Sequence, residues 1–304
     1  MQPSYLSLYQ SGVLTQRVQE AYRMLEKCRV CPRNCGVNRL KGEQGFCGSG
    51  LLPIVSSCNS HHGEEPPISG YRGSGTIFLA NCNLRCVFCQ NYPISQLGAG
   101  NEIRVEELAR MMLKLQKNSC HNINFVTPTH FTPQILYAIE LAARDGLNIP
   151  ILWNTNGYES IEMLKLLDGI ISIYLPDAKY IDPQMAKKYS NTPNYPEVNL
   201  TALKEMWRQA GSLIVDEQMI AQKGMIVRHL VLPEGIAGTK GVLKMLAQEI
   251  STVVHISLMS QYFPANKAAS YPSINRRIIK QEYDDALKWL DQEGLCEGWI
   301  QPYE

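Results

Sequence analysis

The cysteines are the residues of this chain with the greatest capacity for chemistry, and their spacing is uneven. Seven of the ten cysteines fall in two short segments: Cys28, Cys31, Cys35 and Cys47, then Cys82, Cys86 and Cys89. Disulfide scaffolds are usually short secreted chains that cannot build a core, whereas 304 residues can bury a sizeable one. We therefore interpret these thiols as metal ligands in a reducing, cytoplasmic environment.

The composition excludes several other classes of protein. Hydrophobic residues make up 45% of the chain and charged residues 19%, which is typical of a globular protein. The net charge of +1, from 29 basic and 28 acidic residues, argues against a mainly electrostatic nucleic-acid or membrane binder. The first ten residues lack the pattern of a signal peptide, and no run of about 18 apolar residues is present. We expect neither a nucleic acid nor a membrane as partner.

The second cysteine segment has the spacing C-x3-C-x2-C and directly follows an apolar stretch, Thr76 to Ala80, which we predict to be a strand. Three thiolates this close together can ligate three irons of a four-iron cubane and leave the fourth iron open. An open position distinguishes a reactive metal site from a structural one. The alternative is a zinc knuckle whose fourth ligand comes from elsewhere, although zinc sites favour paired C-x2-C units.

The first cysteine segment has the spacing C-x2-C-x3-C-x11-C and supplies four ligands, which close a site completely. A closed tetrathiolate suits structural zinc or an auxiliary iron–sulfur cluster, and the sequence leaves both open. Residues 28 to 75 show little periodicity, and a stretch this long needs something such as a metal to order it. Cys58, His61 and His62 could complete a metal site, but we favour loop residues.

From Gly75 onward, short apolar runs alternate with amphipathic segments. The six predicted strands are Thr76–Ala80, Ile123–Thr127, Ile149–Trp153, Ile170–Leu175, Met225–Leu232 and Val253–Leu258. Predicted helices lie near 13–26, 105–115, 135–143, 161–167, 203–207, 242–250 and 279–290. Repeated strand–helix units predict parallel strands with right-handed crossovers, as in a partial barrel or a doubly wound sheet. Both bind ligands at the carboxyl ends of their strands.

The cysteine motif, with the aromatic Phe88 just before Cys89, resembles that of the radical S-adenosylmethionine (SAM) superfamily. The resemblance covers about Gly75 to Ala265 and implies an α/β fold, a partial (β/α)6 TIM-like barrel. It also implies a 4Fe–4S cluster whose open iron is chelated by the amino and carboxylate groups of SAM. Reductive cleavage of SAM would yield a 5′-deoxyadenosyl radical that abstracts hydrogen from the substrate. Phe88 would lie near the adenine, and a flavodoxin or ferredoxin would supply the electron.

Further segments resemble the pyruvate formate-lyase activating enzymes. They are Gln90-Asn91, Asn154-Thr155-Asn156-Gly157, Asp177-Ala178-Lys179 and Arg228-His229. By that resemblance Asn154 and Asn156 contact SAM, Asp177 ligates a cation, and Lys179 pairs with the SAM carboxylate. Arg228 would contact the SAM carboxylate or ribose. The plain alternatives are a turn at Asn156-Gly157, a solvated pair at Asp177 and Lys179, and an exposed or core-satisfied Arg228-His229.

One segment departs from that pattern. The activating enzymes carry Gly-Gly-Glu at the end of their second strand to hold the SAM amino group, whereas this chain reads Val126-Thr127-Pro128-Thr129-His130. Thr127, Thr129 or a backbone carbonyl would have to substitute, or His130 would face the substrate.

The four-cysteine block resembles instead an uncharacterised group of related radical SAM proteins, which couple it to a Gly63-Glu64-Glu65-Pro66 segment. The glutamate pair could bind a cationic substrate group, act in proton transfer, or form a solvated face.

We therefore predict three regions: an N-terminal helix with a cysteine-rich metal-binding segment (1–74), the radical SAM barrel (75–265) and a helical extension (266–304). The predicted function is radical SAM chemistry, with activation of a glycyl-radical enzyme as one option. A radical SAM enzyme that modifies a small molecule or peptide is the first alternative. A non-catalytic iron–sulfur or zinc module for electron transfer is the second.

Overall fold

Six parallel strands form the centre of the computed structural model, which describes residues 2–303. They are β2 (Ser74–Leu79), β4 (Ile123–Val126), β5 (Ile151–Thr155), β6 (Ile173–Pro176), β8 (Ala221–Leu230) and β9 (His255–Met259). They neighbour one another in the order in which they occur in the sequence. A doubly wound sheet would reverse its strand order, so this order is that of a partial (β/α)6 barrel, as the resemblance implied.

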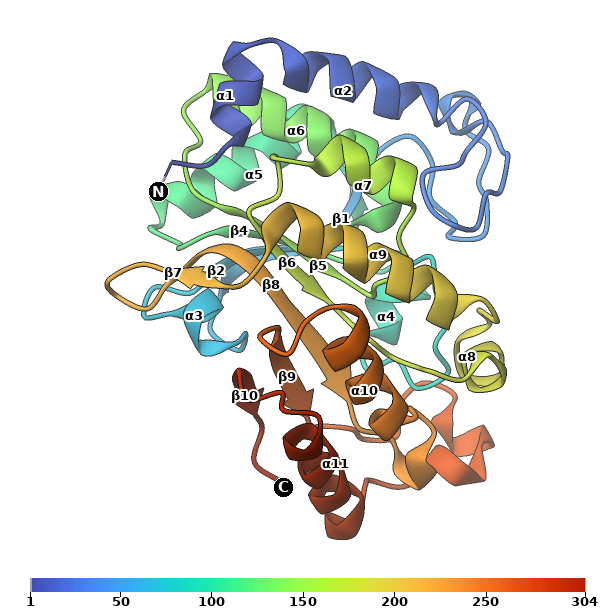
Figure 1. Ribbon diagram of the computed structural model, residues 1–304. Helices are drawn as coiled ribbons and strands as arrows, with labels where there is room; N and C mark the ends of the chain where they lie inside the picture. The colour runs from blue at the N-terminus through green and yellow to red at the C-terminus, as the bar shows by residue number, and fades with distance from the viewer. Residues whose placement is uncertain (1, 304) are drawn as a thin grey trace.

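Helices cover the outer face of the curved sheet (Figure 1). They include α5 (Val105–Lys117), α6 (Thr132–Arg144), α7 (Ile161–Leu167), α8 (Pro183–Ser190), α9 (Tyr195–Ala210) and α10 (Thr239–Glu249). Each central helix has one apolar stripe, such as Leu108, Met112 and Leu115 on α5, and buries it against the sheet. The N-terminal α1 (Tyr5–Gln10) and α2 (Val13–Arg23) pack outside α6 and form a second layer.

Several elements differ from the sequence-based expectation. The stretch expected to lack regular structure contains β1 (Ile54–His61), which pairs antiparallel with β2, and β1 also pairs with β3 (Asn101–Glu102). The C-terminal segment contains α11 (Lys280–Gln292) as expected, but it also adds β10 (Gly298–Ile300) parallel to β9. β1 is rich in Ser and Asn, which are poor strand formers, so pairing with β2 and not local propensity determines it.

The remaining short elements are α3 (Pro66–Ser69), α4 (Tyr92–Ser95) and β7 (Ile214–Val215). None of the helices within residues 2–303 is long and apolar enough to cross a membrane.

The sheet has a different apolar cluster on each face. The larger cluster lies between sheet and helices and includes Phe125 and Trp153. The smaller one lies on the inner face, where Ile68 of α3 packs against Leu152, Ile173 and other inward-facing strand residues. The connection between β1 and β2 therefore folds into the barrel, and its α3 fills part of the interior with apolar side chains.

Candidate functional site

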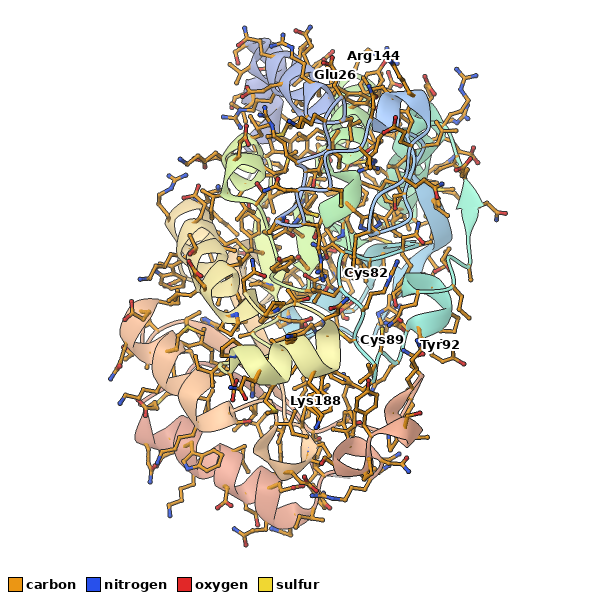
Figure 2. The ribbon with its side chains drawn as sticks, turned by 90° about the vertical axis from the view of Figure 1, so that its right-hand side faces the viewer. Glu26, Cys82, Cys89, Tyr92, Arg144 and Lys188 are labelled. Carbon is orange, nitrogen blue, oxygen red and sulfur yellow. The ribbon has the colours of Figure 1, made fainter. Side chains whose placement is uncertain are left out.

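The loop after β2 carries Cys82, Cys86 and Cys89, and each sulfur has a polar neighbour. Asn156 Nδ2 lies 3.4 Å from Cys82 Sγ, Ser190 Oγ lies 3.0 Å from Cys86 Sγ, and Ser95 Oγ lies 3.2 Å from Cys89 Sγ. Figure 2 shows Cys82 and Cys89 close to one another at the end of the strand, with Tyr92 of α4 beside them. Hydrogen bonds of this kind to cysteine sulfur are a means of tuning iron–sulfur clusters.

Burial disfavours the thiolate form of two of these cysteines, Cys82 and Cys86. It raises the pKa of Cys82 to about 12, because the neighbouring donors only partly compensate the loss of water. Burial also raises the pKa of Cys86, while nearby Lys179 opposes that shift. Coordination to a metal removes such a thiol proton outright. The chemistry of three unpaired thiols on one loop therefore fits an iron–sulfur cluster.

Within residues 2–303 no three His, Cys, Asp or Glu side chains are arranged to chelate a single metal ion. A cubane does not require that arrangement, because each cysteine ligates a different iron. The arrangement of the three-cysteine loop is therefore compatible with a cluster.

The loops after β5 and β6 lie against the cysteine loop. Asn156 donates to Asn83 Oδ1 at 2.7 Å as well as to Cys82, so this Asn is more than part of a turn. The following Gly157 has a φ of 74°, and a Cβ there would lie 2.2 Å from Asn199 Nδ2 and 2.3 Å from the carbonyl oxygen of Asp177. Only glycine fits this position.

Two residues of α9 that the sequence analysis missed hold these loops. Tyr195 Oη donates to the carbonyl of Asn156 at 2.8 Å and lies 3.0 Å from the carbonyl of Asp177. Asn199 Nδ2 lies 3.1 Å from the carbonyl of Gly157 and 2.9 Å from that of Asp177. Both side chains are buried. In the sequence these two residues are indistinguishable from ordinary polar positions of a helix. No motif or spacing indicates that they hold the loops after β5 and β6.

Asp177 and Lys179 form an ion pair at the carboxyl end of β6. Lys179 Nζ lies 2.5 Å from Asp177 Oδ2, and each side chain is 23% exposed. Burial disfavours the charged lysine, but the carboxylate of Asp177 and the nearby Cys86 raise the pKa of Lys179 above its ordinary value. The two predicted roles, cation ligand and carboxylate partner, therefore belong to side chains that neutralise each other in this structure.

Arg228 faces the barrel interior from β8, where two glutamates bind it. Its Nε and Nη2 donate to both oxygens of Glu65, each at 2.7 Å, and Nη2 also donates to Glu64. The glutamate side chains are 6% and 5% exposed, so a solvated face is wrong for this pair. Nε and Nη2 of Arg228 are thus used within the protein, and a direct contact of Arg228 with SAM stays a prediction.

Comparison with known proteins agrees with this site. Residues 76–214 match the profile of the Radical SAM superfamily. Uncharacterized protein MJ0674 of Methanocaldococcus jannaschii is 31% identical over 298 residues, 95% of this chain and 82% of that protein. The chain belongs to the radical SAM superfamily.

Two further similarities complete the comparison. Uncharacterized protein MJ0808 of the same organism is 28% identical over 162 residues, 46% of each chain. The crystal structure of HydG, a maturase of the FeFe-hydrogenase, has a TM-score of 0.50 at 12% identity, over 74% of this chain and 50% of HydG. At that identity the similarity shows a shared fold alone.

In the segment after β4, this chain has no Gly-Gly-Glu, and Thr127, Thr129 and His130 are the candidates for contacts with SAM or substrate. Two of them, Thr129 and His130, are buried. Thr129 is fully buried and donates to Glu159 Oε1 at 2.8 Å. His130 is 1% exposed, and its Nε2 lies 2.8 Å from the carbonyl of Ala80. Burial lowers the pKa of His130 to about 3, so the ring is neutral. His130 supports the backbone just before the cysteine loop, whereas the Thr129 hydroxyl is used by Glu159, and neither buried side chain is placed to contact SAM or substrate.

Thr127 is the residue of that segment that does reach the carboxyl end of β4. It has a φ of 57°, which is rare for a β-branched residue, and its N–H donates to the carbonyl of Asn154 at 2.9 Å. Asn154 faces the inside of the barrel, like Leu152 two residues earlier. Strained backbone of this kind concentrates at functional sites.

Phe88 is buried beside Cys89, with its ring edge-on to Tyr262 at a centroid distance of 5.9 Å. The aromatic position of the radical SAM motif is therefore fixed by packing against the segment after β9.

The N-terminal cysteine block packs directly against the cysteine loop of the barrel. Arg33 Nε donates to the carbonyl of Asn83 at 2.9 Å, and its guanidinium lies 3.8 Å from the ring centroid of Phe46. Arg85 donates to the carbonyl of Phe46 at 2.9 Å. Since Phe46 precedes Cys47, these contacts bring the block beside Cys82.

The fold brings the two ends of the block together. The N–H of Phe46, the residue before Cys47, donates to Cys35 Sγ at 3.4 Å, and the N–H of Gly36 donates to the carbonyl of Cys28 at 3.0 Å. Burial raises the pKa of Cys31 to about 12. All ten cysteines of the chain are unpaired.

Proposed function

We propose that this chain is a radical SAM enzyme whose cluster is ligated by Cys82, Cys86 and Cys89. The observation that carries the proposal is the loop itself: three unpaired thiols at the carboxyl end of β2, each with a polar side chain at its sulfur. When bound, the cluster and SAM supply the electron and the 5′-deoxyadenosyl radical for hydrogen abstraction.

The residues around the loop bind and orient the cofactor. Asn156 donates to a cluster ligand, and Thr127, Asn154 and the Asp177–Lys179 pair present polar groups on the adjacent strand ends. We propose that Lys179 exchanges Asp177 for the SAM carboxylate, or that a cation beside Asp177 bridges to it. Buried Phe88 excludes water from the adenine side. Tyr195 and Asn199 act as positioning residues.

We propose that the N-terminal block binds a second metal centre, either zinc or an auxiliary iron–sulfur cluster, through Cys28, Cys31, Cys35 and Cys47. Its support is the hydrogen bond from the N–H of Phe46, next to Cys47, to Cys35 Sγ, together with the contacts that Arg33 makes with Asn83 and Phe46. A closed set of four thiolates suits a structural or auxiliary centre, because no position is left for substrate.

The substrate has two candidate classes. Activation of a glycyl-radical enzyme requires a protein partner whose glycine loop enters the barrel mouth, and a glycyl-radical spin resonance signal in a co-expressed partner would test it. A small molecule or peptide would enter the same mouth. In either case we expect a cytosolic flavodoxin or ferredoxin as reductant, which suits ten unpaired cysteines.

The decisive experiment measures 5′-deoxyadenosine after anaerobic incubation of the purified protein with SAM and dithionite. We expect product from the wild type and from Cys296→Ala, which alters an exposed, isolated cysteine, but none from Cys86→Ala. Absence of product from a wild-type protein that spectroscopically contains its cluster would contradict the enzyme. In that case, a Cys86→Ala variant that retains the cellular role would favour a non-catalytic metal module.

A further inference from the structure

A pair of glutamates spans the inside of the barrel, and no part of the proposed SAM site uses it. Glu64 and Glu65 lie in the connection between β1 and β2 that enters the barrel. Glu64 Oε1 accepts from Asn124 Nδ2 of β4 at 3.0 Å, and Oε2 accepts from Arg228 of β8. Glu65 binds the same arginine through both oxygens. The pair therefore connects β4 with β8 across the barrel interior, close to the apolar cluster of which Ile68 is part.

The charges of this cluster do not balance. Two buried carboxylates face one guanidinium, which leaves a net charge of −1. His61 Nδ1 lies 3.6 Å from Glu64 Oε1, beyond hydrogen-bond distance, and it accepts a hydrogen bond from the N–H of Gly63 at 3.3 Å. Lys179, at the carboxyl end of β6, is paired with Asp177. A buried charge without a partner is costly, so the cluster lacks one positive charge.

A second observation indicates the kind of group that is missing. Asn124 is fully buried, and within residues 2–303 its Oδ1 has no hydrogen-bond partner. Its Nδ2 donates to Glu64, so the unpartnered carbonyl belongs to the same cluster. Buried polar atoms are rarely left unsatisfied. The cluster thus offers an unused acceptor beside an excess negative charge, and a group with N–H donors and a positive charge satisfies both.

We infer that Glu64, Glu65 and Asn124 form the substrate-recognition site of this enzyme, and that the substrate carries a cationic nitrogen, an ammonium or guanidinium group. The inference rests on the proposed function, because it assigns the substrate class of the same barrel. Arg228 is a positioning residue here: it fixes both carboxylates and leaves one charge for the ligand.

The test uses the anaerobically purified, cluster-loaded protein and 1,4-diaminobutane as the cationic probe. The neutral 1,4-butanediol at equal ionic strength is the reference compound. The readout is the midpoint of thermal unfolding, which ligand binding to the folded state raises. We compare the wild type with Glu64→Gln and with Glu26→Gln, which removes one charge from an exposed position of the chain. The apparent affinities follow from the dependence of the midpoint on probe concentration.

We expect the diamine, but not the diol, to stabilise the wild type and Glu26→Gln. Glu64→Gln should bind the diamine at least about tenfold more weakly, which corresponds to a loss of about 1.4 kcal/mol in binding free energy. Without probe, Glu64→Gln should unfold no earlier than the wild type, because it removes the unbalanced charge. If Glu64→Gln does not fold, Glu65→Gln serves, since loss of either carboxylate balances the charge.

Equal stabilisation of all variants, or none of the wild type, would overturn the inference. The proposed function is tested separately by 5′-deoxyadenosine formation. If the diamine binds but no 5′-deoxyadenosine forms, the proposed reaction is refuted and the cation site stands. If 5′-deoxyadenosine forms but the diamine does not bind, the cation site is refuted and the proposed reaction stands.

Discussion

Replacing Arg228 by methionine should destabilise the protein strongly, because it leaves two carboxylates in the barrel without a cation. The arginine side chain is 16% exposed, and the glutamate side chains are 6% and 5% exposed. Removal of one partner from such a buried pair costs about 3–5 kcal/mol. With an unfolding entropy of about 2.1 cal/mol/K per residue over the whole chain, the unfolding midpoint should fall by about 5–8 °C.

The effect should depend on pH in a defined direction. Burial alone would raise the pKa of Glu65, but Arg228 holds it below its ordinary value. In the wild type this contributes stability above the unfolded pKa of about 4.3, and it is lost as the pH falls through the lower folded pKa. In Arg228→Met burial is opposed only by hydrogen bonds such as the one from Ser257, so we expect the folded pKa of Glu65 to rise. The deficit of the variant is therefore complete at high pH and shrinks as the carboxylates take up protons.

The assay is thermal unfolding followed by circular dichroism between about pH 8 and pH 5, with Arg208→Met as the matched control. Arg208 also contacts two carboxylates, Asp168 and Glu205, but its side chain is 56% exposed. Each such pair of an exposed side chain contributes at most about 1 kcal/mol, so loss of both should lower the midpoint of the control by no more than about 3 °C. A loss that small in Arg228→Met, or a deficit that widens as the pH falls, would refute the reasoning.

Three other substitutions test separate parts of the site. Gly157→Ala should lower the unfolding midpoint well beyond Gly12→Ala, because both have positive φ but only Gly157 has atoms within 2.3 Å of the new Cβ; equal losses would contradict the close packing. Asn156→Ala removes a hydrogen-bond donor to Cys82, so the reduction potential of the cluster should become more negative. A hydrogen bond of about 1 kcal/mol corresponds to roughly 40 mV for one electron. The potential is measured by redox titration followed by electron spin resonance, and an unchanged potential would argue against that bond. Cys31→Ser should remove the second metal in iron, sulfide and zinc analysis while the barrel cluster stays, and an unchanged metal content would exclude the block as a metal site.

Local sequence features predicted most of the barrel. The apolar runs and amphipathic segments placed all six parallel strands to within a few residues, and the helix over residues 161–167 matches α7 (Ile161–Leu167). The strand β1 was missed, since its Ser and Asn residues have no strand propensity and only pairing with β2 makes it a strand. The extra strand β10 was missed for the same reason: it is three residues long and exists by pairing with β9.

The candidate site divides along a similar line. Cysteine spacing along one loop is a local property, so the sequence by itself determined the three-thiol motif and the four-thiol block, and the resemblance to radical SAM proteins rests on the first of them. The pairing of Arg228 with Glu64 and Glu65 joins residues 163 or more positions apart, and no local pattern encodes it. The same holds for Tyr195 and Asn199. Electrostatic and hydrogen-bond partners depend on which side chains face each other across the barrel, and only the tertiary structure decided that.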